Sequence, residues 1–220
     1  MEETNFVLLW KEQYEKIDEA LAINKQLLKE VISQKASSAL QSLIRFKTRG
    51  IIAVVIYLLL LGTVLFYAIL HYSSAVNYFI ISMAAIFLIN LKALYDYVKH
   101  LVWVKNIDYD GSITEIQEKL AKLQLSIMHH SRFMVLQIPF WTTFQLSNKW
   151  FPFDVGWGYI IFQILLTASF TYLAYWLYKS LTVENANKKW VKVLIEGSGG
   201  KSVLKAIAFY KELETFKQVK

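Results

Sequence analysis

Three stretches of the chain lack charged residues over a length that suits a lipid bilayer. They are residues 51–70, 73–91 and 155–178. An α-helix rises about 1.5 Å per residue, so twenty residues reach about 30 Å, which is the thickness of the hydrocarbon core. We therefore expect three membrane-spanning helices at these positions.

A fourth uncharged stretch, residues 133–148, is shorter and contains Pro139. It would reach only about 24 Å as an α-helix, so it is either a fourth span or a buried, re-entrant segment. With four spans, Lys149 is the only Lys or Arg in the loops on one side. The positive-inside rule then places both termini in the cytoplasm and favours the four-span arrangement.

Outside these stretches, apolar positions recur at helical spacing. The seam in the first fifty residues, which has one polar member, is Trp10, Tyr14, Ile17, Leu21, Asn24, Leu28 and Val31. Ser112 and Glu115 form a capping-box pattern that opens a second seamed helix, expected to continue into the span at 133–148. We expect both seams to pair, within one chain or between chains. The candidate helix-interface residues are Asn24, Leu28, Leu120, Leu123, Ile127 and His130.

These patterns predict an all-α, integral membrane protein with four transmembrane helices and cytoplasmic amphipathic, coiled-coil-like helices. Residues 1–50 form the N-terminal helix, whose continuity with the first span stays open. Residues 51–178 form the membrane region, with a cytoplasmic helical insertion at about 95–132, and residues 179–220 form a basic tail of two short helices around the sequence GSGG. We expect the cytoplasmic helices to pack as one layer below the membrane.

Polar residues within the expected spans are all neutral. The candidate intramembrane contacts are Asn77, Asn90, Gln137, Gln145 and Gln163. Neutral groups of this kind commonly bond one membrane helix to another, whereas transport of ions or protons usually requires ionisable groups. The pattern therefore favours helix packing over a conduction path.

Composition supports a membrane protein, since 55% of residues are hydrophobic and only 19% are charged. The net charge of +7 is concentrated beside the expected spans, where anionic lipid headgroups attract Lys and Arg. We expect headgroup contacts, rather than nucleic-acid binding, at Arg45, Lys47, Arg49, Lys188, Lys189 and Lys192.

Motifs that carry chemistry are incomplete. The sequence GSGGKS at 197–202 resembles the end of a phosphate-binding loop, but Ile195 stands where the first glycine is needed. Asp108 to Gly111 resembles a calcium loop, but the required Gly and Glu positions hold Ile113 and Lys119. The chain has no Cys. We expect no catalytic residues, metal or cofactor, and hence not an enzyme.

Several stretches carry a resemblance to a known family: EETNFVLLWKEQYEKID, LIRFKTRGI, NLKALYDYVKHLVW, LSNKWFPFDVGWGYIIFQ and IEGSGGKS. They resemble an uncharacterised family of bacterial integral membrane proteins with four spans. The resemblance implies a multi-pass protein of the bacterial inner membrane. Genes of this family often lie near sigma-factor genes, so the resemblance implies a regulatory role. It implies no catalytic or binding residues.

The leading hypothesis is a non-enzymatic membrane adaptor or regulatory protein that acts through its cytoplasmic helices. It would bind a protein partner or a second copy of itself, with anionic lipid headgroups beside it. The alternative is a small transporter or channel subunit that uses the polar groups of spans two to four.

Overall fold

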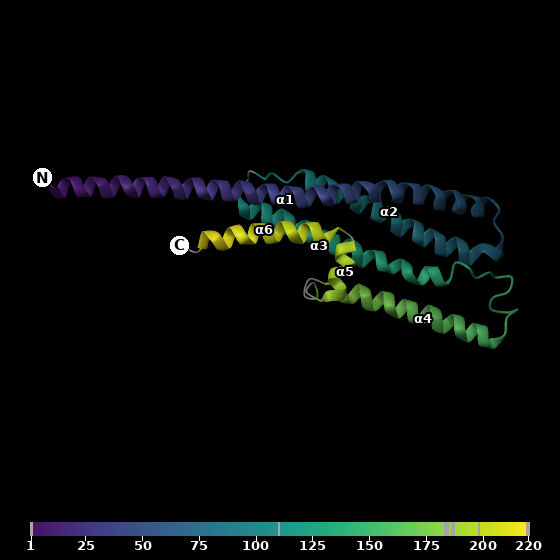
Figure 1. Ribbon diagram of the computed structural model, residues 1–220. Helices are drawn as coiled ribbons and strands as arrows, with labels where there is room; N and C mark the ends of the chain where they lie inside the picture. The colour runs from purple at the N-terminus through teal and green to yellow at the C-terminus, as the bar shows by residue number, and fades with distance from the viewer. Residues whose placement is uncertain (1, 110, 183–184, 186–187, 198, 219–220) are drawn as a thin grey trace.

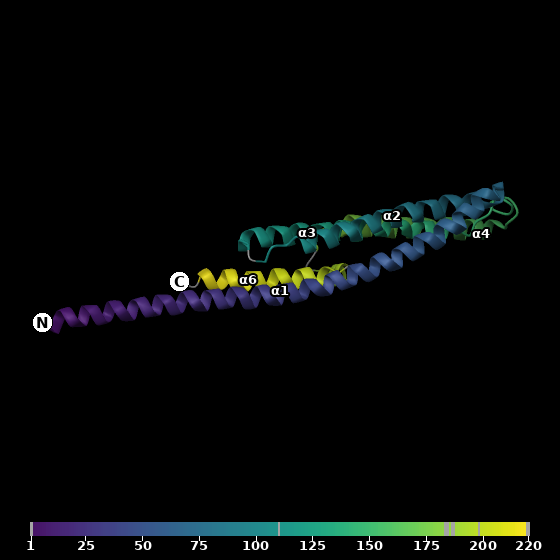
Figure 2. The ribbon, with the colours of Figure 1, turned by 90° about the horizontal axis from the view of Figure 1, so that it is seen from above.

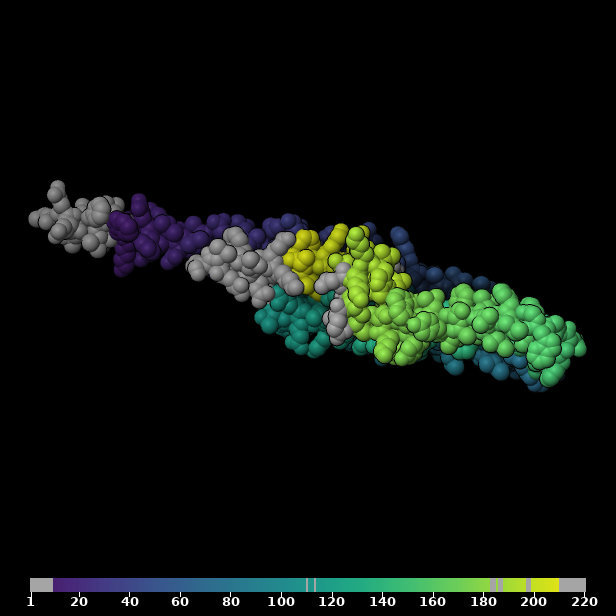
Figure 3. Space-filling view, turned by 90° about the horizontal axis from the view of Figure 1, so that it is seen from below, coloured from purple at the N-terminus to yellow at the C-terminus, as the bar shows by residue number. Residues whose placement is uncertain are grey.

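The computed structural model describes residues 2–109, 111–182, 185, 188–197 and 199–218. Its helices follow one another along the chain as α1 (Glu2–Leu70), η1 (Ser74–Val76), α2 (Asn77–Lys105), α3 (Ile113–Met134), η2 (Val135–Thr142), α4 (Trp157–Ser180), α5 (Lys189–Gly197) and α6 (Gly200–Gln218), where η marks a 3-10 helix (Figure 1). No strand occurs among these residues. The all-α prediction is therefore confirmed. The molecule is elongated, with the start of α1 at one end (Figure 1) and α4 near the other (Figure 3).

Helix α1 is continuous over 69 residues, or about 100 Å, so the N-terminal helix runs without a break into the first apolar stretch. The absence of Pro and the scarcity of Gly in this region permit such a length. Gly50 lies where α1 passes α2, and a side chain there would collide with the ring of Tyr97. The glycine thus allows the two helices to approach closely, while α1 curves towards α2 (Figure 2).

Among the residues that the structure describes, three helical segments are long and apolar enough to cross a membrane: Trp10–Leu70, Ser74–Lys105 and Trp157–Ser180. They cover the expected spans 51–70, 73–91 and 155–178 apart from Ser73, Val155 and Gly156. Their apolar side chains point outward, with Leu60 65% exposed and Leu165 61% exposed. Because a water-soluble protein rarely exposes so much contiguous apolar surface, these helices indicate association with a membrane.

Residues 133–148 do not continue α3 as an α-helix, and that prediction is wrong. Helix α3 ends at Met134, and the 3-10 helix η2 follows and contains Pro139. Proline has no N–H to donate four residues back, and its ring clashes with that carbonyl, which here belongs to Val135. The segment therefore changes form where the clash would begin. It lies in contact with α2 and α4.

The helical parts outside the apolar stretches form a layer around an apolar core of their own. Buried side chains of α1, the end of α2, α3, α5 and α6 contact one another, and Leu40, Leu120 and Val203 are fully buried among them. Figure 1 shows α6 lying beside α1 and α3. The turn into α6 depends on Gly199, whose φ of +92° favours glycine and which lies against Leu43 and Phe46 of α1.

Candidate functional site: an ionic cluster at the end of the spans

Five ionisable side chains gather where α1, α2 and α3 meet, just beyond the apolar stretches 51–70 and 73–91. This junction cluster consists of Lys47, Lys92, Asp96, His100 and His130. Lys47 and His100 are 0% exposed, His130 is 3% exposed and Asp96 is 5% exposed. Charged residues are almost never buried to this degree unless they are paired, so the contacts within the cluster decide what it can do.

Asp96 is the anionic centre of the junction cluster. Its Oδ2 accepts a hydrogen bond from Lys92 Nζ at 2.5 Å and one from His130 Nδ1 at 3.1 Å. The carboxylate thereby joins α2 to α3. The ring of Tyr97 packs beside that of His130, with 5.0 Å between their centroids.

Lys47 brings α1 into the cluster without a hydrogen bond to its ammonium group. Its Nζ lies over the ring of Tyr97, 4.1 Å from the centroid, and the charge of Asp96 attracts it. A cation on an aromatic face gains about 2 kcal/mol or more when desolvated, which offsets only part of the cost of burying the charge. The position of Lys47 therefore depends on both Tyr97 and Asp96.

The two histidines are held as neutral side chains. His100 Nε2 lies 2.9 Å from Ser126 Oγ of α3. Burial lowers the pKa of His130 to about 4, and the positive charge of Lys47 adds to this, against the opposing effect of Asp96. Neutral His130 donates its Nδ1 hydrogen to the carboxylate. Within the described residues, no three or more His, Asp or Glu side chains are placed to hold a metal ion.

The predicted polar residues of the spans divide into two groups. Asn90 Nδ2 donates to Gln137 Oε1 at 3.1 Å and to the Ile86 carbonyl. Gln163 Nε2 donates to the Thr142 carbonyl at 2.7 Å. These bonds tie the segment around η2 to α2 and to α4. In the part of the chain that the structure describes, the side chains of Asn77 and Gln145 make no hydrogen bond, and Gln145 is exposed.

The predicted interface residues lie mostly inside the layer. Leu120, Leu123 and Ile127 are fully buried in its core, and His130 belongs to the junction cluster. Leu28 is half-buried at the edge of the same core, whereas Asn24 is exposed.

The predicted headgroup residues are exposed with one exception. Arg45 and Arg49 on α1 are exposed, and so are Lys188, Lys189 and Lys192 at α5. Lys47 is instead fully buried beneath Tyr97, so its ammonium cannot reach a headgroup, and the prediction for this residue is wrong. The sequence does carry a signal for its burial, because Lys47 continues the apolar seam Ala36, Leu40 and Leu43 at helical spacing.

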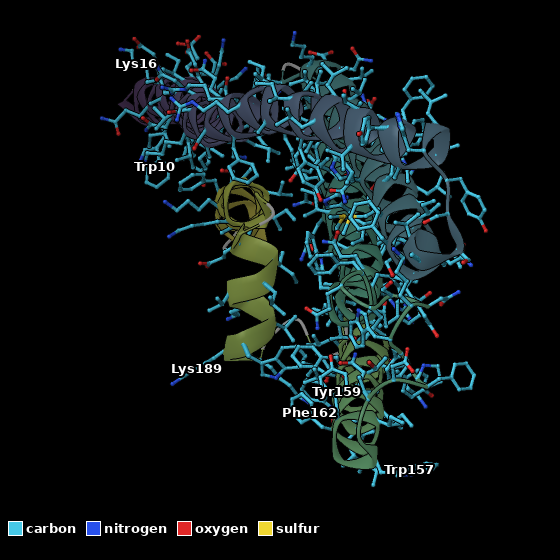
Figure 4. All side chains as sticks on the ribbon, turned by 90° about the vertical axis from the view of Figure 1, so that its right-hand side faces the viewer. Trp10, Lys16, Trp157, Tyr159, Phe162 and Lys189 are labelled. Atoms are coloured by element: carbon cyan, nitrogen blue, oxygen red, sulfur yellow. The ribbon has the colours of Figure 1, made fainter. Side chains whose placement is uncertain are left out.

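A second exposed feature is the apolar seam at the start of α1. This N-terminal stripe consists of Trp10, Tyr14, Ile17, Leu21 and Val31, and each is between 40% and 61% exposed. Every residue from 10 to 27 is exposed. Figures 1 and 2 show this part of α1 projecting beyond α3 and α6. In Figure 4, Trp10 and the ion-paired Lys16 point to different sides of the helix.

Comparison with known proteins yields no match to a protein-family model, to a curated protein or to a solved structure. The junction cluster and the N-terminal stripe therefore have to be interpreted from their own chemistry.

Proposed function

We propose that this protein is a non-enzymatic membrane adaptor or regulatory protein that binds an amphipathic helix of another protein through the N-terminal stripe. The exposure of the stripe supports this most directly. An apolar seam on a helix that projects into water is stabilised when a second helix covers it. Helix α1 also links the stripe rigidly to the first span, so a partner bound there is held at the membrane.

The proposal includes a membrane topology of four crossings, with both termini in the cytoplasm of a bacterial inner membrane. The fourth crossing is the segment at 133–148. A 3-10 helix rises about 2.0 Å per residue, so the eight residues of η2 advance about 16 Å rather than about 12 Å. This greater rise offsets the shortness of the segment.

Satisfied backbone groups also support this fourth crossing, because irregular backbone is tolerated at membrane depth only where protein buries it. Thr142 Oγ1 donates to the Pro139 carbonyl at 2.7 Å, and Thr143 Oγ1 donates to the Phe140 carbonyl at 3.3 Å. Gln163 covers the Thr142 carbonyl. A reporter fused at Lys149 should read as external, and an internal signal would contradict four crossings.

A photo-crosslinking amino acid at Tyr14, within the full-length protein in its native membrane, tests the adaptor role. We expect a crosslink to a different protein that contains an amphipathic helix, and we expect Leu21→Asp to abolish it. The matched control carries the same amino acid at Glu19, which is exposed on the opposite face of α1.

Equal crosslinking from both positions, or none from Tyr14, would contradict the adaptor role. A crosslinked product of twice the mass of the chain, with no other, would replace it by self-assembly. Self-assembly is geometrically feasible, because two copies anchored in the same membrane hold their stripes parallel and in register. The mass of the crosslinked product distinguishes it from binding of a different protein.

The alternative, a transporter or channel subunit, depends on the polar groups of spans two to four. Asn90 and Gln137 bond to each other, and Gln163 bonds to backbone. Groups engaged in this way are suited to holding helices together. The test is solute flux through proteoliposomes that contain the protein. A flux that is lost in a folded Gln163→Leu variant would favour the alternative over the adaptor.

A further inference from the structure

A cavity of about 490 Å³ opens beside the junction cluster, between α2, α3 and the end of α4. Helix α2 contributes Lys92 and Lys99, α3 contributes Arg132 and Phe133, and α4 contributes Tyr178. Three separate helices thus bring cationic and aromatic groups to one hollow.

The cavity lies at the depth where lipid headgroups are expected. Its α2 residues follow the apolar stretch 73–91 directly, and Tyr178 is the last residue of the stretch 155–178. Aromatic residues with one apolar and one polar edge favour this level of a bilayer. Tyr95, which also lines the cavity, is 66% exposed, so the hollow is open to the surroundings of α2.

The charge inside the cavity is positive. Among the described residues that line it, the cations are Lys92, Lys99 and Arg132, and the one acidic residue is Asp96. Lys92 and His130 both donate to Oδ2 of that carboxylate, which reduces its repulsion of a second anion. Two positive charges remain uncompensated.

Arg132, which lines the cavity, has a hydrogen-bond donor without an acceptor in the described part of the chain. Its guanidinium lies over the ring of Tyr178, 4.2 Å from the centroid, so the group is held against α4. Its Nε is buried and has no hydrogen-bond partner among the described residues. A buried donor on a charged group is costly without an acceptor, and guanidinium matches the oxygens of a phosphate in geometry and charge.

We propose that this cavity binds a phosphate ester, presented by the headgroup of an anionic lipid. Arg132 and Lys99 contact the phosphate oxygens, while Phe133, Tyr95 and Tyr178 contact the glycerol and the upper acyl chain. The exposed lysines at α5 attract anionic lipid only by charge, and Lys189 points away from its helix (Figure 4). The cavity differs because groups from three helices surround the headgroup.

Native mass spectrometry of the full-length protein, released from membranes of mixed phosphatidylglycerol and phosphatidylcholine, tests the proposal. We expect retained phosphatidylglycerol in clear preference to phosphatidylcholine. The variant R132Q/K99Q should weaken retention about thirtyfold, since each juxtamembrane cation contributes about fivefold. It leaves the pair of Lys92 and Asp96 in place, and an unchanged thermal unfolding transition verifies its fold.

The control variant K188Q/K189Q removes the same charge from an exposed surface and should retain the lipid. Equal losses in both variants, or equal retention of the two lipids, would overturn the cavity as a site. Millimolar inorganic phosphate is the second arm, and it should leave the bound lipid in place. If phosphate alone displaces the lipid and stabilises the delipidated protein, the site takes a soluble phosphate ester, and its assignment to lipid is wrong.

Discussion

Two neighbouring segments of α1 differ in the burial of their apolar residues. In residues 32–47 the apolar seam faces inward, and Ala36, Leu40 and Leu43 are fully buried against other helices. In residues 51–70 the apolar residues surround the helix, and Leu59 and Leu60 are about two-thirds exposed. One continuous helix therefore has two segments that are suited to different surroundings. The first segment buries its apolar seam in a protein core, whereas lipid can cover the exposed apolar surface of the second.

The junction cluster lies at the boundary between these two segments. Lys47 ends the buried seam, and the uncharged stretch begins four residues later. The N-terminal stripe forms a third case, since it has an apolar seam like residues 32–47 but no cover within the described chain. Substitutions in these three environments should therefore differ in how much they change stability.

The largest effect is expected at the boundary itself. Asp96→Asn removes the anion that attracts the fully buried Lys47 and should lower the free energy of unfolding by about 3–5 kcal/mol. Thermal and denaturant unfolding in detergent measure the loss. The variant K47M/D96N should recover most of it, because a methionine needs no counter-charge. If the double variant were as unstable as the sum of both single variants, the buried charge would not be the cause.

A smaller effect should separate the layer from the spans. Leu120→Ala leaves a void in a fully buried position and should cost about 2–5 kcal/mol. Leu60→Ala removes the same atoms from a side chain that is 65% exposed and should cost less than about 1 kcal/mol in a lipid environment. Equal costs in the two variants would mean that the outward face of 51–70 is covered by another protein rather than by lipid.

Much of the fold could be predicted from the sequence because local patterns determine it. The stretch 51–70 lies inside α1, and most of the stretches 73–91 and 155–178 lies inside α2 and α4. The capping box is partly realised, since the Glu115 N–H donates to Ser112 Oγ at 3.2 Å where α3 begins. The exception is the stretch at 133–148, where the effect of Pro139 on the preceding turn outweighs the helical spacing of the apolar residues.

The junction cluster was not predicted because its parts are far apart in the sequence. Lys47, Asp96 and His130 belong to three helices, and a lysine beside a span is ordinarily a topology signal. Only the packing of α1 against α2 brings Lys47 to Tyr97. The useful signal was positional, since Asp96 and His100 continue the buried seam of Ile86 and Ala93 on α2. Ionisable residues in an apolar seam indicate a partner on another helix.

A third prediction concerns pH. Burial lowers the pKa of His130 to about 4 in the folded protein, while the unfolded chain takes up a proton near pH 6.5. Between these values the unfolded state binds more protons, so stability should fall as the pH falls, by about 1–2 kcal/mol from pH 6.5 to 5. Above about pH 7.5 this contribution is constant, because the histidine is then neutral in both states.

Unfolding curves at several pH values test the role of His130. His130→Gln should flatten the slope between pH 6.5 and 5, whereas replacement of His129, which is exposed on the same helix, should leave it unchanged. An identical slope in all three proteins would assign the pH dependence to another group, of which the neighbouring His100 is the first to examine.

The smallest effect should distinguish the two kinds of polar residue within the membrane region. Gln163 is 2% exposed and donates to the Thr142 carbonyl, so Gln163→Leu leaves that backbone group without its donor. Hydrogen bonds between membrane segments contribute about 0.6–1.7 kcal/mol, and we expect a loss in this range. Gln145→Leu is the matched control. Gln145 is exposed, and a leucine at this position should be at least as favourable in lipid as the glutamine. If both variants unfold at the wild-type temperature, apolar packing alone holds the segment at 133–148. The segment would then be stabilised in the same way as the apolar core around Leu40 and Leu120.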